Sequence, residues 1–227
     1  NALILNQLLN KEGSCNKLVD SERKTTVKTR IYNSNNYVMR YDIEERHDIT
    51  DLELESLLKN IETACQKAPI NAIILQDYNK GLLTEKSIPA IIKTINKYNI
   101  PIAVDPKEAN FLAYKNVSLF KPNLKEVNKA LGLNLTGNQQ KDLAEACINL
   151  SQQLNCDKIL ITLAQHGAVA SEKDNFYSVA AHQRNVIDVS GAGDTVISVA
   201  ALLLALDSDI ETIAFFSNLA GGMTIEN

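Results

Sequence analysis

The sequence has few of the residues that build metal centres or disulfide frameworks. Its 227 residues include four cysteines and three histidines, with no C-x-x-C pair. They are Cys15, Cys65, Cys147 and Cys156, and His47, His166 and His182. Scattered cysteines are typical of reduced thiols in a cytoplasmic protein, and dispersed histidines argue against a zinc site. We therefore expect a cytoplasmic protein without disulfide bonds.

The sequence also lacks an excess of positive charge and any long apolar run. The net charge is −4, whereas nucleic-acid-binding domains usually carry a basic excess. The longest apolar run, residues 199–206, is too short to cross a bilayer. We therefore expect neither nucleic acid nor membrane as a partner. The length suits a single domain over residues 1–227.

Two common phosphate-binding motifs are missing as well. No G-x-x-x-x-G-K-[ST] segment is present, which disfavours a P-loop enzyme. The pair Gly191 and Gly193 is followed by Val196 where the dinucleotide-binding fingerprint has its third glycine. The pair also lies late in the chain, away from a first strand. An NAD-dependent oxidoreductase is therefore disfavoured, although it shares the layout described next.

From Asp51 onward, helical and strand patterns alternate along the chain. This alternation predicts a mostly parallel sheet with helices on both faces. Four polar clusters follow the predicted strands: QDYNKG (76–81), DPK (105–107), KPNLKE (121–126) and TLAQHG (162–167). Any one of them could be an ordinary polar turn. Because ligands of such folds bind at the carboxyl ends of the strands, four together favour a binding site there.

Residues 25–45 show a different pattern, with a period of two. TTVKTRIY and NYVMRYDIEE are joined by Asn-Ser-Asn-Asn, which predicts an antiparallel hairpin. Side chains alternate between the faces of a strand, so Lys28 and Arg30 share one face of the first strand and Arg40 lies on one face of the second. Such a cationic face can simply be solvated, or it can bind an anion.

The segment IDVSGAGDTVISVAALLLA (187–205) places two carboxylates around very small residues. A helical pattern begins near Asp194, and the first amides of a helix have no internal partners. With the helix dipole they form an anion site, which Gly191, Ala192 and Gly193 leave open to a phosphate. Asp194 beside that site suits a general base acting on an attacking hydroxyl. The alternative is that Asp194 is only a helix N-cap.

These segments resemble a known family. DVSGAGD is similar to the D-x-x-G-A-G-D signature of ribokinase-like, PfkB-type carbohydrate kinases, and KPNLKE contains the family's N-x-x-E. TLAQHGA resembles the nucleotide-side glycine segment at Thr162 and Gly167, although Ala164 and Gln165 depart from the commoner wording. Within the family, the sequence looks most like the branch that phosphorylates D-glycero-beta-D-manno-heptose 7-phosphate in ADP-heptose synthesis. The segments that carry this likeness are TTVKTRIY, QDYNKGLLT, VDPK and KPNLKEV.

The resemblance implies roles for individual residues. Asp194 is implied as the base on the anomeric hydroxyl, with Gly191, Ala192 and Gly193 as the anion hole. For ATP and Mg²⁺, the implied residues are Asn123, Glu126, Lys121, Thr162, Gly167 and Asn218, with the metal held through water by Asn123 and Glu126. For the sugar phosphate they are Lys28, Arg30, Arg40, Asp77, Tyr78, Lys80, Asp105 and Lys107. Asp188 and Ser190 match a K⁺ site that only some branches share. Lys107 and Lys121 could equally be surface lysines, and Asn218 an ordinary helix residue.

The implied fold is a ribokinase-like three-layer α/β sandwich, with a mostly parallel sheet and an antiparallel β lid at residues 25–45. In the family this lid covers the sugar and often meets its twin in a homodimer. The family's first strand, its sugar-binding aspartate and its G-G-A-x-N segment have no counterpart here, so we expect a fragment. Two alternatives stay open: another sugar kinase of the family, ribokinase- or fructokinase-like, and a non-catalytic nucleotide- or sugar-binding relative.

Overall fold

The computed structural model describes residues 23–34, 36–67, 69–173, 175–181 and 190–225. The predicted cation ligand Asp188 lies outside them. In the described part of the chain, no helix combines the length and apolar character needed to cross a membrane.

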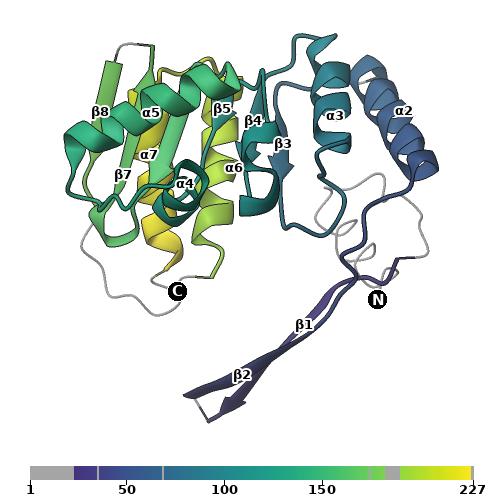
Figure 1. The fold of residues 1–227 in the computed structure, drawn as a ribbon, viewed down its shortest axis with the longest axis horizontal. Coiled ribbons are helices and arrows are strands. Elements are labelled where there is room, and N and C mark those ends of the chain that lie inside the picture. Colours follow the sequence, from purple (N-terminus) through teal and green to yellow (C-terminus); the bar gives the residue numbers. More distant parts are fainter. Residues whose placement is uncertain (1–22, 35, 68, 174, 182–189, 226–227) are drawn as a thin grey trace.

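A six-stranded sheet forms the centre of the molecule (Figure 1). Its strands lie in chain order: β3 (Ile73–Gln76), β4 (Ile102–Asp105), β5 (Leu119–Phe120), β6 (Lys158–Thr162), β7 (Ala168–Glu172) and β8 (Asn175–Val179). The pairings from β3 to β6 are parallel, and those of β6 with β7 and β7 with β8 are antiparallel. The predicted mostly parallel sheet is therefore present, with its antiparallel strands at one edge.

Helices cover both faces of this sheet, which gives three layers (Figure 1). One face carries α2 (Asp51–Lys67), α3 (Ser87–Asn96), the 3-10 helix η1 (Glu108–Ala113), α4 (Leu124–Leu131) and α5 (Gln140–Leu154). The other carries α6 (Ala192–Ala205) and α7 (Ile210–Thr224). A short 3-10 turn, η2 (Ala164–His166), joins β6 to β7.

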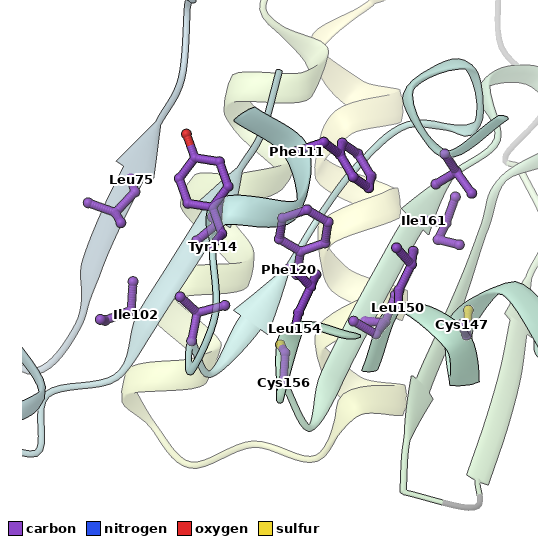
Figure 2. Packing of buried hydrophobic residues seen from close by; sticks show 14 of the residues in the cluster. Leu75, Ile102, Phe111, Tyr114, Phe120, Cys147, Leu150, Leu154, Cys156 and Ile161 are labelled. Carbon is purple, nitrogen blue, oxygen red and sulfur yellow. The ribbon is translucent and has the colours of Figure 1, made fainter. Parts of the chain in front are cut away.

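Alternate residues of the central strands fill two separate cores. In β4, Ile102 and Val104 pack toward α3 and α5, whereas Ala103 packs toward α6 and α7. The larger core holds an edge-to-face contact between Phe111 and Phe120, whose ring centroids are 5.0 Å apart (Figure 2). Strands buried on both faces have continuous apolar runs, and the sequence shows such runs at β4 and β6, whereas the edge strand β3 leaves Ile74 exposed.

The predicted hairpin forms a second, two-stranded sheet that projects from the sandwich (Figure 1). β1 (Val27–Asn33) pairs antiparallel with β2 (Asn36–Ile43), and Ser34 adopts a positive φ of 55° in the turn. Nearly every residue of both strands is exposed. An isolated two-stranded hairpin is marginally stable in water, so this ribbon is the part of the described fold with the least support of its own.

Some predicted boundaries differ from the structure. The predicted strand before the KPNLKE cluster pairs only at Leu119–Phe120, followed by an isolated bridge between Asn123 and Thr162. No pattern in the sequence predicted η1, and α6 begins at Ala192, two residues before the expected start. β5 matters for the site, because Lys121 directly follows it and its side chain reaches Asp105 at the end of β4.

Candidate active site

The carboxyl ends of three parallel strands bring polar side chains together at one edge of the sheet. β3 ends at Gln76, β4 at Asp105, and Lys121 directly follows β5. Because these strands are neighbours in register, residues far apart in the sequence become adjacent there. The prediction that the polar clusters lie at a common edge is confirmed for these three strands.

Lys121 and Asp105 form a buried ion pair at this edge. The Lys121 Nζ lies 2.9 Å from Asp105 Oδ1, and the two residues are only 3% and 5% exposed. The other oxygen, Asp105 Oδ2, accepts a hydrogen bond from Gln76 Nε2 at 2.5 Å. Buried charges are expensive unless they are paired, so this arrangement is held together as a unit. Of the two interpretations left open for Lys121, an exposed surface lysine is wrong.

The N-terminus of α6 lies beside this ion pair. Gly191 precedes the helix with φ of 83°, a conformation that favours glycine. The first hydrogen bond of the helix runs from the Thr195 amide to the Gly191 carbonyl, at 2.9 Å, so the amides of residues 192–194 precede the hydrogen-bonded turn. A Cβ added to Gly193 would lie 3.9 Å from Lys121 Nζ. Backbone amides and an ammonium group therefore meet here, as an anion site requires.

Asp194 is the third residue of α6, and its side chain is exposed toward the strand ends. Its Oδ1 accepts hydrogen bonds from Gln76 Nε2 and from the Tyr78 hydroxyl, both at 3.1 Å. Gly191 occupies the N-cap position, without a side-chain cap. The alternative that Asp194 serves as the N-cap is therefore wrong. Partial burial, and then the hydrogen bond to Asp194, raise the pKa of Tyr78, so the phenol stays a donor at neutral pH.

Asp77 and Lys80, in the same segment as Tyr78, hold the segment in place through contacts with other parts of the chain. Asp77 is buried and accepts hydrogen bonds from the Tyr114 hydroxyl at 2.8 Å and from the Asn79 amide at 2.6 Å. Lys80 pairs with Glu44, which follows β2. The sequence predicted all three positions 77, 78 and 80 as sugar contacts. In the structure, Tyr78 faces Asp194, Asp77 fixes the loop, and Lys80 anchors the base of the hairpin.

Asn123 and Glu126 form a capping box at the start of α4. Asn123 Oδ1 accepts from the Glu126 amide and Glu126 Oε2 accepts from the Asn123 amide, both at 2.9 Å. Glu126 Oε1 lies 3.0 Å from Lys107 Nζ. Burial opposes the charge on Lys107, but Glu126, Asp105 and Asp77 together outweigh it and raise the Lys107 pKa. Lys107 is therefore charged, and it faces the same strand ends as Lys121.

The predicted nucleotide-side residues lie further along the sheet. Thr162 ends β6 and bridges to Asn123. Gly167 has φ of 87°, and an added Cβ would come within 2.0 Å of the Val179 carbonyl oxygen. Asn218, on α7, donates to the Ala180 carbonyl at 3.0 Å. Close packing thus accounts for glycine at position 167, and a backbone contact accounts for Asn218, without a ligand.

One contact between the hairpin and the site joins Lys28 and Tyr78. The Lys28 ammonium lies 5.4 Å from the centre of the Tyr78 ring, within the range of a cation–π interaction. Further along the same face, Arg30 pairs directly opposite Arg40. Arg40 forms an ion pair with Asp42, in which Asp42 Oδ1 lies 3.0 Å from Arg40 Nε. Like charges placed directly opposite in a sheet are unfavourable, so this face suits an anionic ligand.

Comparison with known proteins identifies the family. The profile of the pfkB family of carbohydrate kinases matches residues 4–227.

The chain belongs to this family of carbohydrate kinases.

Curated relatives point to one branch of the family. A protein named bifunctional protein HldE from Aliarcobacter butzleri (strain RM4018) is 34% identical over 215 residues, which is 95% of this chain and 44% of that protein. One of the same name from Desulfatibacillum aliphaticivorans is 34% identical over 209 residues, which is 92% of this chain and 42% of that protein. The chain therefore spans under half the length of these curated relatives.

Solved structures show the same fold. Phosphofructokinase-2 from Escherichia coli, in complex with potassium, superimposes with a TM-score of 0.83 at 21% identity, over 99% of this chain and 72% of that one. Ribokinase from Arabidopsis thaliana, complexed with ribose and ATP, superimposes with a TM-score of 0.67 at 14% identity, over 91% of this chain and 64% of that one. The predicted ribokinase-like α/β fold and the predicted kinase class are both confirmed.

A kinase of this family implies ATP and Mg²⁺, and the site residues fit a metal that arrives with the nucleotide. Both Glu126 oxygens already accept or pair with protein groups. Among the residues described, no group of three or more His, Cys, Asp or Glu side chains could hold an ion. Mg²⁺ typically keeps several waters and phosphate oxygens with only one or two carboxylates, which suits Asn123 and Glu126 acting through water. Of the two predicted K⁺ ligands, only Ser190 is described; it is exposed just before α6.

Three residues of this site were missed by sequence reasoning. Gln76 is the last residue of β3 and the first of the polar cluster 76–81, but no role was assigned to it from the sequence. Tyr114 follows η1, and Glu44 follows the hairpin, where nothing in the sequence pattern pointed to a site. All three act through long-range contacts, which a local pattern cannot reveal.

Proposed function

We propose that the protein transfers the terminal phosphoryl group of ATP to the anomeric hydroxyl of heptose 7-phosphate, a step of ADP-heptose synthesis. The observation that carries the proposal is Asp194 in the first turn of α6, beside amides that can receive a phosphoryl group. The likeness of the hairpin and strand-end segments to heptose-phosphate kinases favours this sugar. The curated relatives named HldE support the same branch.

In the proposed reaction, Asp194 takes the proton of the anomeric hydroxyl as the oxygen attacks the γ-phosphorus, and the bond from the γ-phosphorus to the β–γ bridging oxygen breaks, which releases ADP. The amides of residues 192–194 and the α6 dipole stabilise negative charge on the transferring group. Lys121, held by Asp105, adds a fixed positive charge beside them. Mg²⁺, when bound with ATP, supplies charge neutralisation between the phosphates. The described residues thus position the reactants and stabilise charge, as phosphoryl transfer requires.

The cationic face of the hairpin would recognise the phosphate that the sugar already carries. Arg30 lies two residues beyond Lys28, about 7 Å further along the strand. A sugar with its anomeric end at Asp194 would extend past Tyr78 and Lys28 toward Arg30 and Arg40. Charge-assisted bonds from these arginines would distinguish a sugar phosphate from a free sugar.

The opposite face of the hairpin supports the expected homodimer. It exposes Ile31, Met39, Tyr41 and Ile43, whose side chains share one face in the register of the two strands. An apolar face of this kind on a projecting ribbon marks an interaction surface. We propose that two copies meet through it, and that residues 1–227 belong to one kinase domain with residues 25–45 as its lid. A K⁺ ion near Ser190 is proposed by analogy with the potassium complex of phosphofructokinase-2.

A coupled assay of ADP release tests the substrate. We expect turnover with D-glycero-beta-D-manno-heptose 7-phosphate and much weaker turnover with ribose or fructose 6-phosphate. The reverse preference would place the protein in a ribokinase- or fructokinase-like branch of the family. Absence of turnover with all three, together with retained ATP binding, would favour the non-catalytic alternative.

Replacing Asp194 tests the base. Asp194→Asn should lower kcat by about 10²- to 10⁴-fold, the contribution typical of a general base. The affinity for ATP, measured by calorimetry, should change little because the amides remain in place. A kcat equal to that of the wild type would remove Asp194 from the mechanism.

A further inference from the structure

We propose that Gln76 is a positioning residue for the base Asp194, working with the Tyr78 hydroxyl. This inference rests on the proposed role of Asp194. Gln76 ends β3, whereas its two partners, Asp105 and Asp194, come from β4 and α6. Its Nε2 lies 2.5 Å from Asp105 Oδ2 and 3.1 Å from Asp194 Oδ1.

The chemistry of the amide explains why glutamine suits this place. A primary amide nitrogen carries two hydrogens, so one nitrogen can donate to two acceptors at once. Both neighbours here are carboxylate oxygens, which accept and cannot donate when ionised. The amide orientation is fixed for the same reason, because the Gln76 oxygen in this place would face two carboxylates. Gln76 thus connects two negative groups that would otherwise repel each other.

The rigidity of Gln76 comes from the buried ion pair behind it. Asp105 is itself held by Lys121 at 2.9 Å, so a continuous chain runs from Lys121 through Asp105 and Gln76 to Asp194. Buried side chains in a sheet move little, whereas the Asp194 side chain is exposed and would otherwise sample several rotamers. These connected contacts therefore restrict the rotamers of the exposed Asp194 side chain, because they tie it to the buried ion pair.

Gln76 and Tyr78 also determine which oxygen of Asp194 is available. Both donors act on Oδ1. Oδ2 is thereby left to accept the proton of the sugar hydroxyl. The Lys28 ammonium over the Tyr78 ring extends the same network to the hairpin. Closure of the hairpin over the sugar would therefore act on Tyr78, one of the two residues that orient Asp194.

Kinetics of the full chain with the sugar phosphate that the wild type turns over test this proposal. Gln76→Leu keeps the approximate volume but removes both donors, and we expect kcat to fall about 10- to 100-fold because a misplaced reacting group costs that much. Tyr78→Phe removes one of two donors and should cost about 3- to 10-fold. The KM for ATP should stay within about twofold, because neither side chain meets the anion site.

Matched controls are available elsewhere in the chain. Gln66 donates to the Tyr98 hydroxyl at 3.0 Å on the α2–α3 surface, away from the strand ends. Gln66→Leu and Tyr98→Phe make the same chemical changes and should leave kcat unchanged. Because Gln76→Leu leaves the buried Asp105 Oδ2 without its donor, we expect its Tm in circular dichroism to be lower than that of Gln66→Leu, and the kinetics are measured well below that Tm.

A double variant separates positioning from a general structural effect. If Gln76 acts through Asp194, Gln76→Leu should cause no further loss in kcat when Asp194→Asn is already present. Three results would overturn the proposal: a Gln76→Leu kcat close to wild type, an equal loss in Gln66→Leu, or a full additional loss in the double variant. Normal turnover in Asp194→Asn would instead refute the proposed function itself.

Discussion

The strand-end site and the hairpin use charged side chains in opposite ways. At the strand ends, Lys121 and Asp105 are buried against each other and connect through Gln76 to Asp194. On the hairpin, Arg30 and Arg40 lie opposite each other on an exposed ribbon, with no buried partner to fix them among the described residues. One region is ordered by its own contacts, and the other has unfavourable contacts that a ligand can relieve.

In the proposed function, the strand ends carry out the chemistry and the hairpin recognises the substrate. Phosphoryl transfer depends on placing groups accurately, and accurate placement comes from elements with buried support. Recognition of a mobile, charged substrate gains from an exposed element that can close over it. Changes at the strand ends should therefore affect stability and kcat together, whereas changes on the hairpin should affect substrate affinity while the fold stays intact.

The largest expected loss of stability follows from breaking the buried ion pair. Lys121→Met leaves the Asp105 carboxylate buried without its cation, and removal of one partner of such a pair costs about 3–5 kcal/mol. Urea unfolding followed by circular dichroism measures the free energy of unfolding. Lys129→Met removes a comparable but exposed pair with Glu108 and should have little effect. Equal losses in the two variants would show that burial does not distinguish them.

A smaller loss is expected at the turn before β7. In Gly167→Ala the new Cβ would meet the Val179 carbonyl oxygen at 2.0 Å, at φ of 87°, and we expect a destabilisation of about 2–4 kcal/mol. Gly132→Ala has a similar φ of 66° but no atom within 4 Å, so it should cost only about 1 kcal/mol. The same urea titration measures both. An equal decrease in the free energy of unfolding in Gly167→Ala and Gly132→Ala would show that the close packing at Gly167 contributes nothing.

On the hairpin, the expected effect is on substrate affinity. Arg30→Ala should raise the KM for the sugar phosphate about 10- to 100-fold, since a hydrogen bond to a charged group contributes about 1.5–3 kcal/mol. The Tm should stay at the wild-type value because Arg30 is exposed. Lys141→Ala, an exposed cation on α5, serves as the control and should leave the KM unchanged. An unchanged KM in Arg30→Ala would make the cationic face a solvated surface.

The smallest effect on the chemical step is expected from the apolar face of the hairpin. Tyr41 is 58% exposed there, and Tyr41→Glu should convert a dimer to a monomer in light scattering without unfolding the sandwich. Lys28→Glu places the same charge on the opposite face, within the regular register, and should leave the dimer intact. Dissociation in both variants, or in neither, would contradict assembly through this face.

Much of the fold was predictable because its signals are local. The apolar run at Ile73–Gln76, the alternation at Val27–Asn33 and the helical pattern at Gln140–Leu154 each follow from neighbouring residues, and all three elements are present. The signature around Asp194 indicated the candidate base for the same reason. Where the pattern was short, as at Leu119–Phe120, or irregular, as at Glu108–Ala113, the prediction missed the boundary or the element.

The sequence by itself determined the strand–helix order, the hairpin, the family signature and the residue types of the site. Only the tertiary structure decided that Gln76 and Tyr78 donate to the same oxygen of Asp194, that Lys121 is buried with Asp105, and that Asn123 and Glu126 cap α4. The reason is physical. Propensity and periodicity act over a few residues, whereas the partner of a buried polar group is chosen by whichever strand end or helix the packing of the two cores places beside it.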